Sequence, residues 1–259
     1  MSPADSGADP HVLGTRVDAT SYADATAQVM DWAKNAESRY VCCANVHVVM
    51  EAYDSPAFRS QVNAADLVTP DGMPLVWALR RQGHPNQTRV YGPDLMMSVI
   101  ESAARENVAV GLLGGKLEVL EELVSRLVSQ FPALDISYRF SPPFRALNAS
   151  EDNRIVEDIK KSGARILFVG LGCPRQEMWM AEHAGKVQAV MLGVGAAFDF
   201  HAGAVKQAPS WMQRTGLEWA YRLSQEPTRL WRRYLYHNPR FLVARWTGSN
   251  PKSGSQRHL

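Results

Sequence analysis

Two short apolar runs, each followed by a glycine-rich polar loop, lie between Ala164 and Gly203 and restrict the fold more than any other feature. The first run, 166–169, leads into the loop 170–174, and the second, 189–194, leads into the loop 195–203. Continuous apolar runs of this length, bounded by glycine, are typical of strands in a parallel sheet. Because ligands of such sheets bind at the carboxyl ends of the strands, the sequence predicts an α/β protein with a binding site at these loops.

The first loop favours an anionic ligand. A helix is expected to start at Pro174, and the free N–H groups and positive dipole at such a helix end suit phosphate. The dinucleotide motif G-x-G-x-x-G nevertheless fails, because Arg175 and Phe198 stand where its third glycine would be. Gly114-Gly115-Lys116 also fails as a P-loop, since position 110 is not glycine. The residues alone predict an anion-binding cleft without a named cofactor.

Strand-like and helix-like segments alternate through most of the chain, which predicts a Rossmann-like, mostly parallel sheet flanked by helices. Further strands are expected at 12–17, 39–44, 67–68, 108–113 and 136–139. Helices are expected at 22–36, 46–53, 56–64, 74–81, 93–105 and 117–130, and from a Ser150 cap to Lys161. The predicted organisation is an α/β core over 11–205, a basic helical C-terminal appendage over 206–246, and disorder over 1–10 and 247–259.

The appendage is set apart by its charge. The formal net charge of the chain is +2, but residues 1–205 carry −6 and residues 206–259 carry +8. A helix is expected to begin at Glu226-Pro227, and Arg229, Arg232, Arg233, Arg240 and Arg245 surround its tryptophans and tyrosines. This pattern fits a helix bound to an anionic membrane surface, and it fits equally a helix packed on the core with a solvated basic face.

Cysteine and histidine spacing indicates neither a disulfide framework nor a metal site. Cys42, Cys43 and Cys173 form no such pattern, and His47, His183 and His201 share no metal-ligand spacing, so packing or surface roles are expected. The N-terminus lacks the features of a signal peptide, and no run reaches the ~18 apolar residues of a spanning helix. These features fit a cytoplasmic protein.

Several motifs together resemble the WecG/TagA/CpsF family of bacterial glycosyltransferases, which act in surface-polysaccharide and teichoic-acid synthesis. The resemblance covers roughly positions 11 to 245, and the agreement of many motifs in one order makes chance agreement a poor explanation. The motifs that carry it are Asp71–Pro74, Arg89–Leu95, Gly170–Trp179, Gly193–Asp199, Ala208–Met212 and Gly216–Arg229.

The resemblance implies an inverting hexosyltransferase. Its donor would be a UDP-sugar, with N-acetylmannosamine or a related sugar, and its acceptor a polyprenyl-diphosphate-linked sugar. The enzyme would lie at the inner face of the cytoplasmic membrane, bound peripherally through its C-terminal segment. The sequence contains no Asp-x-Asp motif, which fits the family's metal independence, and no cofactor is expected. No nucleic-acid partner is expected, and a homo-oligomer is left open.

Three residues are predicted to be catalytic, each with a plainer alternative. The resemblance makes Asp71 the base that deprotonates the acceptor, although Asp71-Gly72 alone reads as a turn. Arg89 is expected to neutralise the departing phosphate, or to be a solvated loop arginine. Asn45 is expected to orient the acceptor or the base, or to cap a helix. Cys43 stands where the family usually has threonine, which weakens a hydroxyl role there.

The remaining site residues are predicted to bind the nucleotide sugar. Gln176 would hydrogen-bond it, Glu177 would bind it or serve the helix dipole, and Asp199 would bind a sugar or remain a buried turn carboxylate. The resemblance implies that the appendage completes the site, so its arginines are expected to stabilise UDP. The predicted set is Gly114, Gly115, Gly172, Gln176, Glu177, Asp199, Arg229 and Arg233.

Two other classes remain as alternatives. A nucleotide-dependent oxidoreductase on a Rossmann-like sheet would need the glycine motifs that fail here, and an absorbance assay with NAD(P)H distinguishes it. A non-catalytic, membrane-associated module would bind UDP or lipid without turnover.

Overall fold

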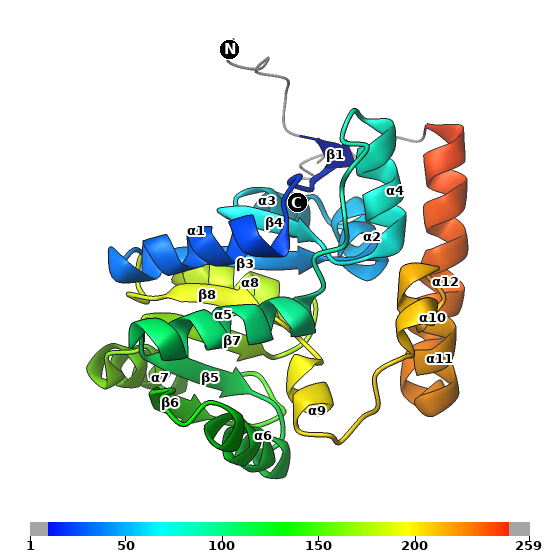
Figure 1. Ribbon diagram of the computed structural model, residues 1–259. Helices are drawn as coiled ribbons and strands as arrows, with labels where there is room; N and C mark the ends of the chain where they lie inside the picture. The colour runs from blue at the N-terminus through cyan, green and yellow to red at the C-terminus, as the bar shows by residue number, and fades with distance from the viewer. Residues whose placement is uncertain (1–9, 249–259) are drawn as a thin grey trace.

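The computed structural model describes residues 10–248, which form a six-stranded parallel sheet with helices on both faces (Figure 1). The strand order is β4-β3-β8-β7-β5-β6, and every neighbouring pair is parallel. The predicted α/β class and Rossmann-like sheet are therefore confirmed. The strands are β3 (Arg39–Ala44), β4 (Leu67–Pro70), β5 (Val110–Gly114), β6 (Ile136–Phe140), β7 (Ile166–Gly170) and β8 (Val190–Gly193).

Alternate side chains of the sheet enter two separate cores. In β3, Val41 and Cys43 belong to one core and Tyr40, Cys42 and Ala44 to the other, as the two-residue period of a strand requires. The first core is covered by α1 (Tyr22–Lys34), α5 (Gly92–Glu106), α6 (Leu117–Gln130) and α9 (Ala197–His201). The second is covered by α2 (Val46–Asp54), α3 (Pro56–Asn63), α4 (Met73–Arg81), α7 (Ala149–Ser162) and α8 (Arg175–His183).

The C-terminal segment forms three helices, drawn in orange to red in Figure 1. They are α10 (Ser210–Arg214), α11 (Glu218–Gln225) and α12 (Pro227–Thr247), so the appendage is helical as predicted. Helix α12 packs against α2 and α11, and its Phe241 is buried in the second core. One side of α12 is therefore packed on the core, as the alternative to a membrane-bound helix predicted.

Three local expectations were wrong. Residues 12–17 are not one strand, because β1 (His11–Val12) and β2 (Thr15–Arg16) pair antiparallel around Leu13 and Gly14, both with positive φ. Helix α7 is capped by Asn148 rather than Ser150, because Asn148 and Glu151 form a reciprocal capping box. Disorder was expected over 1–10 and 247–259, whereas the Pro10 carbonyl accepts from the N–H of Val17, Thr247 ends α12 and Gly248 caps it. Positions 1–9 and 249–259 of that expectation lie outside the described residues. Within residues 10–248, no helix has the length and apolar character needed to cross a membrane.

Candidate active site

A cleft of about 810 Å³ separates the carboxyl edge of the sheet from the C-terminal helices. Loops that follow all six strands of the sheet line one side, and arginines of α11 and α12 line the other. Most of the residues predicted for the site therefore meet in one place, although Arg89 and Gly114 are not among the lining residues. The lining includes Asn45, Asp71, Gly115, Gly172, Gln176, Glu177, Asp199, Arg222, Arg229 and Arg233.

Asp71 is the carboxylate at the end of β4. Its backbone N–H donates to the carbonyl of Ala44 at 2.8 Å, which continues the pairing of β4 with β3 and fixes the loop. The side chain is buried. Burial raises the pKa of Asp71 to about 6. The charge of Arg89 opposes this rise, and the charge of Glu218 adds to it. A carboxylate with such a pKa is largely ionised at neutral pH and still basic enough to accept a proton.

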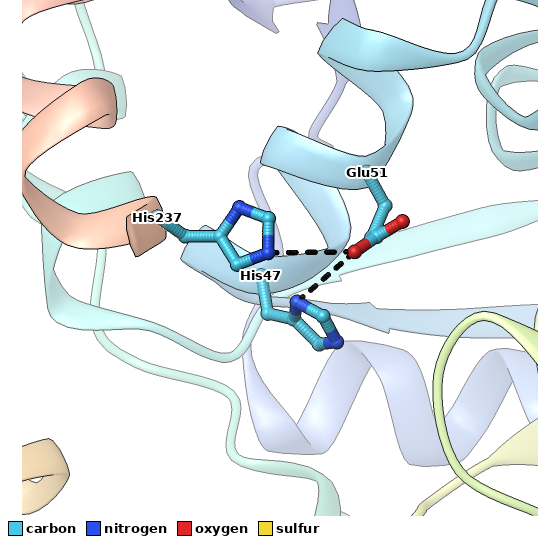
Figure 2. Close-up of side chains that lie close together, drawn as sticks. All are labelled: His47, Glu51 and His237. Atoms are coloured by element: carbon cyan, nitrogen blue, oxygen red, sulfur yellow. Dashed lines mark ion pairs between the residues drawn. The ribbon is translucent and has the colours of Figure 1, made fainter. Parts of the chain in front are cut away.

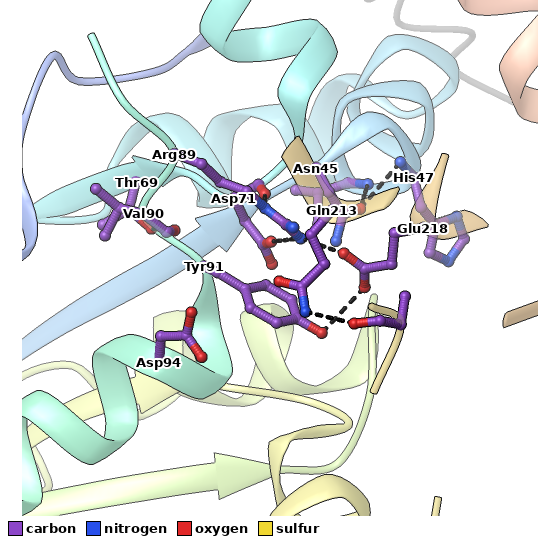
Figure 3. Close-up of polar contacts among 12 residues, drawn as sticks. Asn45, His47, Thr69, Asp71, Arg89, Val90, Tyr91, Asp94, Gln213 and Glu218 are labelled. Atoms are coloured by element: carbon purple, nitrogen blue, oxygen red, sulfur yellow. Dashed lines mark hydrogen bonds and ion pairs between the residues drawn. The ribbon is translucent and has the colours of Figure 1, made fainter. Parts of the chain in front are cut away.

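Arg89 holds Asp71 in place (Figure 3). Its Nε donates to the backbone carbonyl of Asp71, and its Nη2 lies 3.1 Å from Oδ1 of the same residue. The same nitrogen lies 2.7 Å from Oε2 of Glu218, and the guanidinium carbon lies 3.9 Å from the centre of the Tyr91 ring. The guanidinium is therefore directed at the two carboxylates rather than into the cleft.

Glu218 and Tyr91 complete this group, and neither was given a role from the sequence. The hydroxyl of Tyr91 donates to Oε1 of Glu218 at 3.0 Å, and Glu218 is the first residue of α11 (Figure 3). A carboxylate of the appendage thus enters the environment of Asp71. Both residues lie inside motifs that carry the family resemblance, and this was the one sequence feature that could have indicated a role for them.

Asn45 caps α2, as its plainer alternative expected. Its Oδ1 accepts from the backbone N–H groups of His47 at 3.0 Å and Val48 at 3.3 Å. Asn45 also lies beside the loop of Asp71, since a Cβ on Gly72 would stand 3.4 Å from its Cα. The cap uses the carbonyl oxygen of the side chain, so an orienting role for its amide group stays a prediction.

Gly114 and Gly115 let β5 and β7 approach each other at the cleft. Gly114 has φ +126°, and a Cβ there would lie 2.5 Å from the backbone of Gly170. Gly115 has φ +70°, and its N–H donates to the carbonyl of Gly170 at 3.2 Å. Only glycine fits position 114, and the close approach that it permits brings the lining residues Gly115 and Gly170 together.

Gln176 and Glu177 are buried under the loop that contains Gly172. Gln176 accepts from the N–H of Gly172 at 3.1 Å through Oε1, and its amide nitrogen donates to Glu177 at 2.8 Å. Glu177 is fully buried, and burial raises its pKa. In this arrangement the amide oxygen of Gln176 supports the loop and its amide nitrogen is bonded to Glu177, whereas hydrogen bonding to the sugar remains a prediction.

The opposite side of the cleft is basic. Burial raises the pKa of Asp199 in α9, while the charges of Arg229, Arg222 and Lys116 act in the opposite direction. Arg229 forms an ion pair with Glu226 at 2.7 Å. The Nε atoms of Arg222 and Arg233 are buried and have no hydrogen-bond partner among residues 10–248. Buried donors of this kind are suited to an anionic ligand.

Two of the three histidines named from the sequence have the expected packing roles. His183 contacts Asp152 through Nε2 at 2.8 Å and the carbonyl of Trp179 through Nδ1 at 2.7 Å. His201 contacts the carbonyl of Pro93 at 2.9 Å. His47 differs, because it lies next to Glu51 and His237.

The fold places this chain among α/β proteins that bind ligands at the carboxyl ends of a parallel sheet, and the cleft lies at that edge. Comparison with known proteins defines it further. The model of the Glycosyl transferase WecG/TagA/CpsF family matches residues 10–252. The chain is also 32% identical, over 206 residues, to the N-acetylglucosaminyldiphosphoundecaprenol N-acetyl-beta-D-mannosaminyltransferase of Bacillus spizizenii strain W23, covering 79% of this chain and 77% of that protein.

The chain therefore belongs to the WecG/TagA/CpsF family. The resemblance found in its motifs is confirmed over nearly the whole described chain. The protein is accordingly a glycosyltransferase of cell-envelope polysaccharide synthesis.

Proposed function

We propose that this glycosyltransferase moves N-acetylmannosamine, or a closely related sugar, from a UDP-sugar to a polyprenyl-diphosphate-linked sugar with inversion at the anomeric carbon. The relative from Bacillus spizizenii supports the sugar and the lipid-linked acceptor through its name. The observation that carries the proposal is the arrangement of the cleft, in which buried Asp71 lies on one side and the unpartnered Nε atoms of Arg222 and Arg233 lie on the other.

In this mechanism Asp71 accepts the proton of the acceptor hydroxyl. The hydroxyl oxygen attacks the anomeric carbon from the face opposite UDP, and the bond between that carbon and the phosphate oxygen breaks. Its electron pair leaves with UDP, so negative charge develops on the departing diphosphate. Fixed cations directed at developing charge are an effective means of lowering a barrier.

The structure suggests separate roles for the arginines. Arg222, Arg229 and Arg233 line the cleft and are proposed to stabilise UDP, with Lys116 beside them. Arg89 contacts both the carboxylate and the carbonyl of Asp71, so we assign it to positioning the base. This replaces the direct contact with phosphate that the sequence suggested for Arg89. The cationic lining supports a mechanism without a metal on the diphosphate.

The acceptor determines where the enzyme works. A polyprenyl-diphosphate sugar is anchored in a bilayer, and the exposed aromatic and basic residues of α12 suit a membrane interface. We propose peripheral association with the inner face of the cytoplasmic membrane through this helix.

The test is a UDP-release assay over a panel of UDP-sugars with a short-chain lipid-diphosphate sugar as acceptor. Acceptor-dependent release with one N-acetylated hexosamine donor is expected, and NMR of the product should show inverted anomeric configuration. UDP or lipid binding without turnover across the panel would favour the non-catalytic module instead.

A further inference from the structure

Three side chains capable of binding a metal ion meet where α12 packs on α2 (Figure 2). His47 and Glu51 come from successive turns of α2, and His237 comes from α12. The Oε1 atom of Glu51 lies 3.7 Å from Nδ1 of His47 and 3.4 Å from Nε2 of His237. All three ligand atoms lie within 4.8 Å of one another.

Helix geometry and packing bring the three side chains together. Residues four apart on a helix share a face, which places His47 and Glu51 side by side. His237 is buried by the contact between α12 and α2, and Arg240 strengthens that contact through two hydrogen bonds to Asp54, at 2.6 and 2.8 Å. The cluster therefore depends on the docking of the C-terminal helix.

The distances within the cluster are too long for good hydrogen bonds. Nδ1 of His47 is buried and has no hydrogen-bond partner in the described part of the chain. The ring does form a hydrogen bond to the backbone of Cys173, which raises its pKa and so is a bond to the carbonyl. Because Nδ1 is unpartnered, this donor is Nε2–H. The lone pair of Nδ1 is then left facing the carboxylate of Glu51.

Two lone pairs that face each other repel unless a cation lies between them. Zinc binds imidazole nitrogen and carboxylate oxygen at about 2.0–2.1 Å, and tetrahedral ligands at that radius are about 3.3–3.4 Å apart. The two separations from Glu51, 3.4 and 3.7 Å, are close to this spacing, and the two histidine nitrogens lie within 4.8 Å of each other. The hydrogen bond from His47 to a backbone carbonyl is also the contact that usually orients a metal-binding histidine.

We propose that His47, Glu51 and His237 form a binding site for a divalent first-row transition metal, of which Zn²⁺ is the expected ion. Three protein ligands leave at least one coordination position for water or another ligand. Imidazole ligands favour Zn²⁺ and its neighbours over Mg²⁺, which prefers oxygen. The site adjoins the cleft, because His47 is among the cleft residues, but none of its three ligands is an arginine proposed to stabilise UDP.

The charges around the cluster are compatible with a bound cation. A metal ion binds imidazole in its neutral form, and Glu51 supplies a negative charge to the cluster. Asp54 pairs with Arg240, so that arginine is already neutralised. Arg233 is a nearby positive charge that opposes a bound cation.

A metal here would fasten the appendage to the core. Asn45, which lies beside the loop of Asp71, caps α2, whereas α12 carries Arg229 and Arg233 on the other side of the cleft. A bond network through the metal would hold these two sides at a fixed separation. The ion would thus act as a structural clamp on the site.

The test measures Zn²⁺ binding to the full-length protein after chelation and dialysis, by equilibrium dialysis with metal analysis. One Zn²⁺ per chain is expected, and Co²⁺ should give the intense visible absorption of a four- or five-coordinate site. Glu51→Gln and His237→Gln should each weaken Zn²⁺ binding by at least ~10-fold and abolish the Co²⁺ spectrum. His84→Gln and Glu121→Gln, which change a histidine and an exposed glutamate elsewhere, are the matched controls and should bind normally.

Thermal unfolding with and without Zn²⁺ provides the second measurement. Zn²⁺ should raise the Tm of the wild-type protein and of both controls, but not that of Glu51→Gln or His237→Gln. Melting curves without metal show whether each variant is folded. Absence of Zn²⁺ binding in the wild-type protein, or equal binding and equal Tm shifts in folded Glu51→Gln and His237→Gln variants, would overturn the proposal.

Discussion

Nη2 of Arg89 lies 2.7 Å from Oε2 of Glu218, and this contact joins the sheet edge to the first residue of α11. The same nitrogen contacts Asp71, so a carboxylate of the appendage and the proposed base share one cation. The side chains of Arg89 and Glu218 are only 15% and 13% exposed, so solvent weakens the interaction little. The docking of the appendage therefore affects the protonation of Asp71.

The base itself is tested by Asp71→Asn, which keeps the size of the side chain and removes the proton acceptor. Turnover should fall by at least ~100-fold, the usual effect of losing a general base. Donor binding should persist, because the arginines that line the other side of the cleft are unchanged. Steady-state rates with purified acceptor, together with UDP-sugar titrations, measure the two effects. Near-wild-type turnover would exclude Asp71 as the base.

The pH dependence of kcat/KM should report the raised pKa of Asp71. Only the ionised carboxylate can accept a proton, so activity should fall as the pH is lowered through about 6, by about tenfold per unit below it. Glu218→Gln removes a negative charge that raises this pKa. It also leaves Asp71 as the only carboxylate paired with Arg89 among the residues of this group. Both changes move the acidic limb to lower pH.

Tyr91→Phe is the matched control for this shift. It removes the hydrogen bond to Glu218 but leaves every carboxylate charge in place. Its acidic limb should therefore move much less than that of Glu218→Gln. Identical pH profiles for the wild-type protein and Glu218→Gln would show that Glu218 does not act on the base.

Chelation should leave the chemical step intact, because fixed arginines rather than a metal are proposed to hold UDP. Any loss of turnover in EDTA should remain far smaller than the ~100-fold effect of losing a catalytic group. The Glu51→Gln variant, which lacks the proposed structural metal, is the control. If removing that metal causes a modest loss of turnover in the wild-type protein, EDTA should cause no such loss in this variant. Complete loss in both proteins, reversed by Mg²⁺ or Mn²⁺, would contradict the arginine mechanism.

The close approach of β5 and β7 predicts that alanine destabilises the fold more at Gly114 than at Gly185. Gly114→Ala places a Cβ against the backbone of Gly170 and should destabilise the fold by about 2–4 kcal/mol through positive φ and overpacking. Gly185→Ala has positive φ but no atom within 4 Å of the added Cβ, so about 1 kcal/mol is expected. Chemical unfolding of the two variants measures the difference. Equal effects would mean that the strand ends separate easily.

The sequence predicted those features that depend on local pattern. The apolar run before Gly170 is a strand, and Asp71 follows a strand end, because both depend on neighbours in the chain. The contact between Arg89 and Glu218 could not be predicted in this way, since nothing in either motif indicates how α11 docks. His47 and Glu51 have the spacing of helix neighbours, but their partner His237 is brought to them only by the packing of α12.

The exposed side of α12 offers a test of whether this helix contacts the membrane or only packs on the core. Trp231, Leu235, Leu242 and Trp246 are exposed and recur at intervals of four and seven residues, so they form one stripe along the helix. The five arginines contribute less to this surface than the sequence suggested, because Arg240 pairs with Asp54 and Arg233 lines the cleft. Truncation after Ala208 is a poor test, since it would remove buried core residues of α12 as well.

Replacing the four stripe residues by serine removes the apolar surface and leaves the buried side of α12 intact. Each such side chain contributes about 1.5–3 kcal/mol when transferred from water, so affinity for anionic vesicles should fall by more than ~100-fold. Liposome co-sedimentation measures this loss, and the double variant Leu117→Ser, Val128→Ser on α6 is the control for exposed apolar residues elsewhere. Activity on a water-soluble acceptor should survive in the stripe variant, because the cleft is unchanged, whereas activity on acceptor in vesicles should be lost. Undiminished vesicle binding by the stripe variant would show that the exposed side of α12 is not the membrane contact.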